Sequence, residues 1–119
     1  MDYEGHAVSE AIEYQTHIAY GAILEGLLAA VRRLKESVNI RLHVNNAVLA
    51  AQIRQQSFNL WNRRDGRTAR GQPVSDWDLW TAIYMEIAMT NSVLKEADTE
   101  IPKEKRDTLR IRIKRPRSR

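Results

Sequence analysis

The chain has 119 residues, 43% of them hydrophobic, no cysteine, and a formal net charge of +4. This length predicts one domain, and the hydrophobic fraction is too high for a wholly disordered chain. The lack of cysteine excludes a disulfide scaffold, a thiolate zinc site, an iron–sulfur cluster and a cysteine nucleophile.

The positive charge is concentrated near the C-terminus. Residues 103–119 hold nine basic and two acidic side chains, a net charge of +7, whereas residues 1–102 hold ten basic and thirteen acidic side chains, a net charge of −3. The sequence therefore predicts a domain over 1–102 and a basic tail over 103–119. Such a tail favours contact with nucleic acid, an acidic protein or an anionic membrane, and a disordered solubilising end is the alternative.

The first expected helix runs from about Ala7 to Glu36, because its apolar residues recur at steps of three and four. Its most apolar stretch, 18–31, is shorter than the about 20 residues that a membrane span needs, and the first residues lack the basic start of a secretory signal. We therefore expect a cytoplasmic protein without a membrane span. Small residues form a smooth face for a second helix, from this chain or from a second copy in a dimer: Ala19, Gly21, Ala22, Gly26, Ala29 and Ala30.

Two further helices are expected. Poor helix formers between Ser37 and His43 predict a turn, and one continuous helix through this stretch is the competing interpretation. The second helix runs from about Leu42 to Arg64 and ends at Asp65-Gly66, since glycine suits a helix C-cap. A glycine- and proline-containing loop over residues 63–75 overlaps the end of this helix and holds Arg63, Arg64, Arg67 and Arg70. The third helix starts at the N-cap Ser75 and fades near residue 97.

The segment after Pro102 has the period of a strand, because three apolar residues alternate with basic ones: Leu109, Ile111 and Ile113. An isolated strand is not stable alone, so it would need a sheet edge to pair with. Residues from Pro116 onward are expected to be disordered. Together the elements predict an all-α fold, either a three-helix bundle or an extended helical hairpin, with a basic C-terminal tail.

No catalytic motif is recognisable. The sequence has neither a P-loop nor a nucleophile elbow. Glu13 and His17 lie one helical turn apart, but di-iron bundles use a Glu-x-x-His spacing that is one residue shorter, so we expect a surface pair. We therefore expect no enzyme activity, no metal, no cofactor and no small-molecule substrate.

Three tryptophans flank the arginine loop: Trp61, Trp77 and Trp80. Aromatic residues at helical spacing usually seal a core, here with Phe58 and Tyr84. The competing interpretation is an aromatic-and-arginine binding surface, because tryptophan and arginine are frequent at binding hot spots and aromatic rings stack on bases.

Arginine predominates among the basic residues, which suits bidentate and salt-sensitive phosphate contacts. The candidate residues for binding nucleic acid or a partner are Arg63, Arg64, Arg67, Arg70, Arg106, Arg110, Arg112, Lys114, Arg115, Arg117 and Arg119. The predicted function is a small non-enzymatic accessory protein, whose helical body docks on a protein or dimerises and whose tail binds nucleic acid. The alternative is a structural subunit whose tail docks on a partner protein.

Residues 53–82 carry a helix–loop–helix pattern made of Ile53-Arg54, Leu60-Trp61, Gly66-Arg67, Gly71 and Asp76-Trp77. This pattern resembles a small bacterial domain family of unknown function. The resemblance implies a structural role for Leu60, Trp61 and Trp77, and no known activity.

Overall fold

The computed structural model describes residues 9–15, 19–105 and 108–114. Four strands, four α-helices and a short 3-10 helix follow one another in these residues. In chain order they are β1 (Ser9–Gln15), α1 (Tyr20–Val31), β2 (Asn39–His43), α2 (Ala47–Arg54), α3 (Ser57–Arg63), α4 (Trp77–Met89), β3 (Val93–Asp98), η1 (Lys103–Lys105) and β4 (Thr108–Lys114). The expected all-α fold is therefore wrong.

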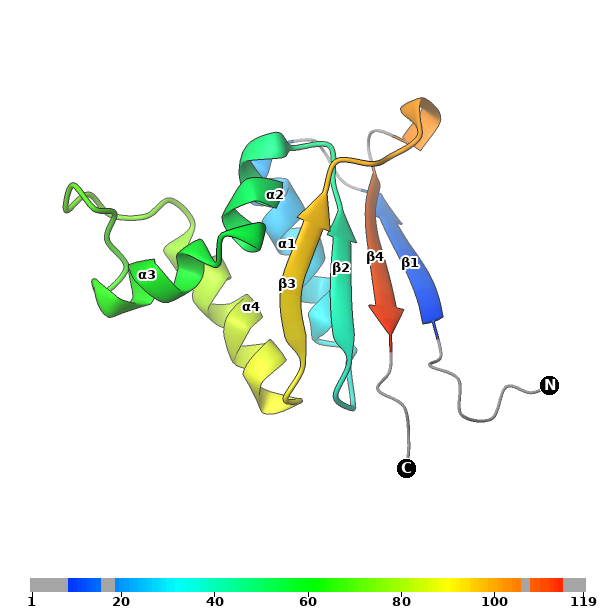
Figure 1. The fold of residues 1–119 in the computed structure, drawn as a ribbon, viewed down its shortest axis with the longest axis horizontal. Helices are drawn as coiled ribbons and strands as arrows, with labels where there is room; N and C mark the ends of the chain where they lie inside the picture. Colours follow the sequence, from blue (N-terminus) through cyan, green and yellow to red (C-terminus); the bar gives the residue numbers. More distant parts are fainter. Residues whose placement is uncertain (1–8, 16–18, 106–107, 115–119) are drawn as a thin grey trace.

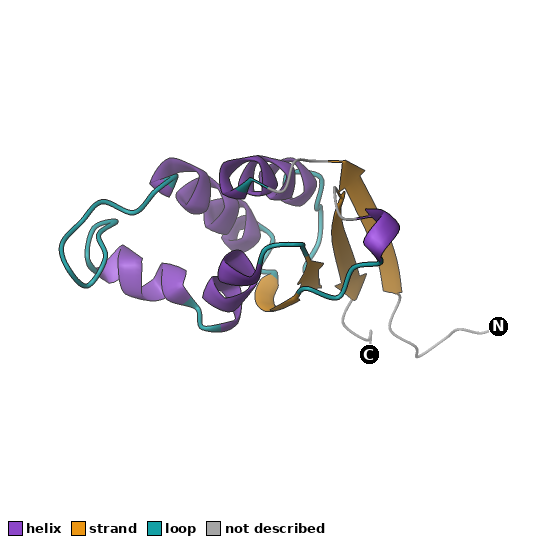
Figure 2. Cartoon of the chain, turned by 90° about the horizontal axis from the view of Figure 1, so that it is seen from above, coloured by secondary structure: helices purple, strands orange, loops and turns teal. Residues whose placement is uncertain are grey.

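The strands form one mixed sheet in the order β1-β4-β2-β3 (Figure 1). β2 and β3 run parallel, and the three helices α2, α3 and α4 connect them, as parallel neighbours require a long crossover. β4 runs antiparallel to both β1 and β2. Seen from above, the helices gather on one side of the sheet (Figure 2), so the opposite face of β2 and β4 is open.

β2 lies where the sequence predicted only a turn, and it separates α1 from α2. The continuous long helix is therefore also wrong. In β2, Ile40 and Leu42 point into the core, whereas Asn39 and Arg41 are exposed. This alternation over four residues is the period of a half-buried strand. Because the alternation is so short, the poor helix formers in this stretch predicted only a turn.

The first expected helix is in fact β1 followed by the shorter α1. The buried side of α1 includes Ile23, Leu24 and Leu27, which are spaced at three and four residues as a helical core stripe requires. A Cβ added at Gly26 would lie 3.3 Å from Leu109 Cδ2. The small residue thus lets α1 approach β4, and this part of the smooth face is covered by the same chain.

The second and third expected helices are also divided. α2 and α3 are separated at Gln56, which adopts a left-handed φ of 55°. Its side-chain amide donates to the carbonyls of Ile53 and Leu94, at 2.8 and 3.1 Å. The predicted third helix ends at Met89, and its last part is β3. Its expected N-cap also differs, because Asp76 rather than Ser75 occupies the N-cap position.

The strand period of the C-terminal segment is confirmed, since β4 covers residues 108–114. Leu109, Ile111 and Ile113 are at most 4% exposed and belong to the main core. Both neighbouring strands come from the same chain, so pairing with another protein is not what orders this segment. Among the described residues, no helix combines the length and apolar character needed to cross a membrane.

We predict that β4 contributes strongly to stability. Replacing Ile111 with alanine should lower the free energy of unfolding by about 2–5 kcal/mol, because it removes buried methyl groups and leaves a cavity. Urea denaturation measures this. The neighbouring change Arg112→Ala, on the open face, should stay within about 0.5 kcal/mol of the unaltered chain. Equal effects of the two changes would contradict the placement of β4 in the core.

Candidate nucleic-acid interface

The open face of the sheet carries basic side chains from two adjacent strands. In the register of β2 and β4, Arg41 lies opposite Arg112, Asn39 opposite Lys114, and His43 opposite Arg110. Arg112 and Lys114 are exposed. The basic residues expected in a tail are therefore held in fixed positions on a sheet, because their apolar neighbours are anchored in the core.

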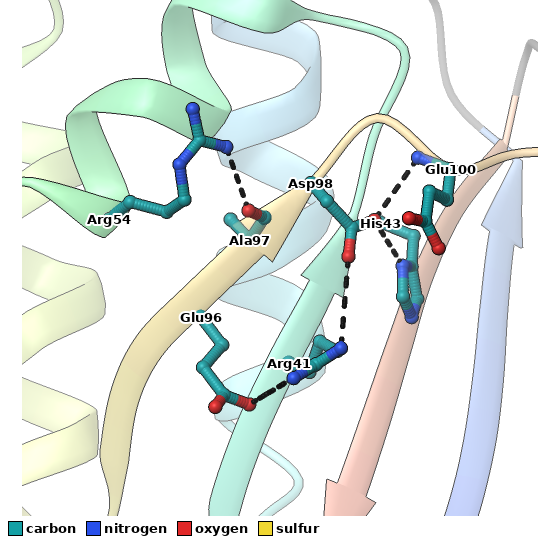
Figure 3. A network of polar contacts seen from close by, with 7 residues as sticks. All are labelled: Arg41, His43, Arg54, Glu96, Ala97, Asp98 and Glu100. Carbon is teal, nitrogen blue, oxygen red and sulfur yellow. Dashed lines mark hydrogen bonds and ion pairs between the residues drawn. The ribbon is translucent and has the colours of Figure 1, made fainter.

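Arg41 is neutralised by acidic residues of β3. Its guanidinium lies 3.0 Å from Glu96 Oε1 and 4.0 Å from Asp98 Oδ2 (Figure 3). The hydrogen bond to Glu96 raises the pKa of Arg41. This pairing also offsets the repulsion that two arginines directly opposite each other would produce.

His43 and Asp98 form a hydrogen-bonded pair at the ends of β2 and β3 (Figure 3). His43 Nδ1 lies 2.6 Å from Asp98 Oδ1, and the backbone N–H of Glu100 donates to the same oxygen at 3.1 Å. His43 is only 6% exposed. A carboxylate at Nδ1 fixes this nitrogen as a donor and orients the ring.

Two atoms among the described buried side chains have no hydrogen-bond partner: His43 Nε2 and Tyr84 Oη. Burial raises the pKa of Tyr84 to about 12, so its hydroxyl is neutral and packs among Phe58 and Trp80. His43 differs, because it lines an open-face cavity of about 500 Å³ with Arg41, Arg112 and Lys114.

The arginine loop between α3 and α4 lies at the far end of the molecule from β4 (Figure 1). Arg63, Arg64, Arg67 and Arg70 are all exposed. The loop is nevertheless ordered by its own hydrogen bonds, in which Arg67 Nη1 donates to the Gly71 carbonyl at 3.0 Å and the Thr68 N–H donates to the Gln72 carbonyl at 2.8 Å.

A cavity of about 770 Å³ lies beside this loop. Its lining joins the loop to α1, α2 and α3, and consists of Tyr20, Gln52, Trp61, Thr68, Arg70, Gln72, Pro73, Val74, Ser75 and Asp76. Arg70 and Asp76 are the basic and the acidic side chain of this lining. The cavity thus combines a cation, a carboxylate, two aromatic rings and several hydrogen-bonding groups.

The three tryptophans divide between the two expected roles. Trp80 is fully buried, as a core role predicts, and its Nε1 donates to the Tyr20 hydroxyl at 3.2 Å. Trp61 packs edge-on against Trp80, with ring centroids 5.4 Å apart, but also lines the cavity beside Arg70. Trp77 is half-buried and stacks on Phe58. Trp61 is therefore placed where a ligand held by the loop would contact it.

Tyr20 links the core to this cavity. Its hydroxyl donates to Gln52 Oε1 at 2.5 Å and accepts from Trp80. Burial raises the pKa of Tyr20, despite the opposing hydrogen bond from Trp80, so the hydroxyl stays neutral near pH 7. The chain of hydrogen bonds fixes the Gln52 side chain at the cavity wall.

The candidate residues do not form one site. The structure gathers Arg110, Arg112 and Lys114 on the open sheet face, and it leaves the loop arginines at the other end. Four candidates lie outside the described residues: Arg106, Arg115, Arg117 and Arg119. The expected Glu13 and His17 pair also lies outside them, since His17 and the Glu13 side chain are not described.

Sequence reasoning missed His43 and Asp98 because 55 positions separate them. The sequence feature that could have located His43 is the alternation of polar and apolar residues that ends there, because it marks the end of a strand. Among residues 9–15, 19–105 and 108–114, no three His, Cys, Asp or Glu side chains are grouped so that they could hold a metal ion.

The chain is similar to curated ribonuclease H sequences. The Thermus thermophilus sequence is 32% identical over 79 residues, which is 66% of this chain and 45% of the relative. The Moorella thermoacetica sequence is 33% identical over 66 residues, which is 56% of this chain and 43% of the relative. The Actinobacillus pleuropneumoniae sequence is 26% identical over 87 residues, which is 73% of this chain and 56% of the relative. The chain thus spans about half the length of these relatives.

No protein-family model matches the chain, and no solved structure matches it significantly. The resemblance to a bacterial family of unknown function therefore stays a prediction. The ribonuclease H similarity is to an enzyme, and it contradicts the expected non-enzymatic accessory protein. It is consistent with contact with nucleic acid, whereas nothing found supports the expected protein partner or the alternative structural subunit.

The geometry of the loop predicts unequal effects of two glycine changes. Gly66 and Gly71 have φ values of 81° and 82°, but a Cβ at Gly66 would lie 2.5 Å from Trp77 Nε1, whereas one at Gly71 meets nothing within 4 Å. Gly71→Ala should lower the unfolding free energy by about 1–2 kcal/mol through backbone strain alone. Gly66→Ala should lose about 1–3 kcal/mol more from the clash. Thermal or urea unfolding that finds equal losses would contradict this account.

The Asp98 pair predicts a dependence of stability on pH. Burial raises the pKa of Asp98, but the hydrogen bonds from His43 and Glu100 and the nearby positive charge outweigh it, so the net pKa is lowered. A carboxyl pKa that is lower in the folded state stabilises the fold above its ordinary range, near pH 4, and this stabilisation is lost as the pH falls further.

Asp98→Asn should therefore flatten the fall in unfolding free energy below about pH 4. Denaturation at a series of pH values measures the slope. Glu104, which is exposed in η1, provides the control change Glu104→Gln, and this variant should keep the slope of the unaltered chain. If the Asp98→Asn slope also stays the same, the pair does not stabilise the fold.

Proposed function

We propose that the chain acts on RNA as a ribonuclease H-like nuclease, and that the arginine loop and the cavity beside it contact the nucleic acid. One observation carries this proposal: Arg70 and Trp61 line the same cavity of about 770 Å³. Ligand pockets usually have about 300–1,000 Å³. The ribonuclease H similarity supports the choice of substrate class.

The loop supplies positive charge for the phosphate backbone. Arg63, Arg64, Arg67 and Arg70 project around one short loop that contains a single acid, Asp65. Arginine contacts phosphate through two parallel hydrogen bonds, and each neutralised phosphate releases counterions. Binding through these residues is therefore independent of base sequence and weakens steeply with salt.

The cavity supplies contacts to a base or sugar. Trp61 offers an aromatic ring of the kind on which bases stack. Gln52, held in place by Tyr20, can donate its amide N–H groups, while the hydroxyls of Thr68 and Ser75 can donate or accept. A nucleotide entering beside Arg70 would thus meet both a ring and polar groups.

Asp76 is the carboxylate of this cavity and the proposed general base. Its Oδ2 lies 3.4 Å from the position of a Cβ built on Gly21, in the first turn of α1. Negative charge is favoured at a helix N-terminus. In the proposed hydrolysis, Asp76 takes a proton from a water molecule that attacks the phosphorus, while Arg70 stabilises the charge on the phosphate. The P–O bond to the leaving oxygen breaks, and this oxygen takes a proton from solvent water.

The test is binding and cleavage of labelled RNA across a salt series. The double variant Arg67→Gln/Arg70→Gln should bind more weakly, and its slope of log affinity against log salt should fall by about 1.4–1.8, since each lost phosphate contact removes about 0.7–0.9. The control Lys35→Gln/Lys103→Gln removes two exposed charges elsewhere and should bind as the unaltered chain does.

Cleavage is measured on the same RNA. Asp76→Asn should reduce the rate by about 100-fold or more while binding is kept, because general base catalysis contributes about 10²–10⁴-fold. Asp78→Asn, in the exposed first turn of α4, is the matched control. Absence of salt-sensitive binding or of cleavage by the unaltered chain would overturn the proposed function, and equal cleavage by the two variants would remove Asp76 from it.

A further inference from the structure

The second cavity, on the open face of the sheet, holds groups that the proposed function does not use. Its eight lining residues come from β2, β3, β4 and the segment after β3: Asn39, Ile40, Arg41, His43, Glu96, Glu100, Arg112 and Lys114. This face lies away from the arginine loop, which is at the other end of the molecule (Figure 1).

The charges in this cavity are unevenly paired. Arg41 is held by Glu96 and Asp98, at 3.0 and 4.0 Å. Arg112 and Lys114 have no ion pair or hydrogen bond through their side chains in the part of the chain that the structure describes. Two cations from alternate positions of one strand therefore face a cavity without an acidic partner.

His43 provides a third group. Its ring is more than nine-tenths buried, Nδ1 is bonded to Asp98, and Nε2 has no partner. An unpaired buried nitrogen lowers the stability of the fold, and such a group requires an explanation. A ligand that bonds Nε2 would remove this penalty.

We propose that this cavity binds a phosphate group, with His43 Nε2 forming a hydrogen bond to it and with Arg112 and Lys114 pairing to its oxygens. The Asp98 carboxylate holds the His43 ring through Nδ1, which leaves Nε2 for the ligand. Arg112 contributes a planar fork that can bind two oxygens, and Lys114 contributes a point charge. His43, Arg112 and Lys114 lie on the open face of two adjacent strands, and the register places Arg112 between the other two along the strand direction.

The paired groups around the cavity limit what can bind. Glu96 and Glu100 repel an anion that extends beyond Arg112 and Lys114. Arg110, which lies opposite His43 in the register, adds positive charge near the start of β4. A compact anion with several acceptor oxygens therefore fits better than an extended acidic peptide. Phosphate could come from the free ion, a nucleotide or a nucleic-acid backbone, and the proposal does not depend on nuclease activity.

The test follows the His43 ring resonances by NMR while inorganic phosphate is added at constant ionic strength, with sodium chloride as the exchanged salt. Saturable shifts of His43 are expected with phosphate and not with chloride. Arg112→Gln/Lys114→Gln should weaken the affinity at least about tenfold, because the variant loses two groups that form charge-assisted hydrogen bonds. Both residues are exposed, so the double variant should fold.

The matched control is Lys35→Gln/Lys103→Gln, which removes the same charge elsewhere and should bind phosphate as the unaltered chain does. A nucleoside monophosphate and a short RNA strand are then titrated in the same way. Tighter binding of either identifies the source of the phosphate. Absence of a saturable His43 shift with all three probes, or an equal loss in the two double variants, would overturn the site. Neither result depends on RNA cleavage.

Discussion

The structure depends on the alternation of β4, whose apolar side chains enter the core while its basic ones face the open side. Leu109, Ile111 and Ile113 join the sheet to α1 and the other helices. Because a strand has a period of two, the same burial fixes the positions of Arg112 and Lys114. The basic residues that composition assigns to a tail thereby form a surface of defined geometry, and the register with β2 places Arg112 opposite Arg41, two positions along β2 from His43.

The sequence predicted the features that depend on local chemistry. The strand period of β4, the glycine-rich arginine loop and the main part of α4 follow from neighbouring residues, and each is present. The error in fold class came from β1, β2 and β3, which have five to seven residues each. β4 also has seven residues, but its apolar and basic residues alternate. β1 and β3 do not alternate over their length and β2 has only five residues, so a strand period is hard to separate from that of a helix, and long-range pairing rather than propensity decides their structure.

The site residues divide in the same way, into those that can be recognised from the local sequence and those that depend on long-range pairing. The loop arginines could be found from composition, because glycine and proline mark their loop. The His43 and Asp98 pair could not, because only the parallel pairing of β2 with β3 brings the two strand ends together. The cavity beside the loop also depends on distant segments, since Tyr20 and Gln52 reach it from α1 and α2. Sites built across elements require the topology, which a single sequence does not provide.

The position of β4 in the chain has a consequence for biosynthesis. β4 pairs with β1 and β2, yet it follows every other element that the structure describes. While the chain emerges from the ribosome, one edge of β2 and the whole of β1 therefore lack their hydrogen-bonding neighbour until the residues of β4 arrive. Unpaired edges can join other chains, so the nascent protein passes through an interval in which rapid synthesis of β4, or protection by a chaperone, favours a correct sheet.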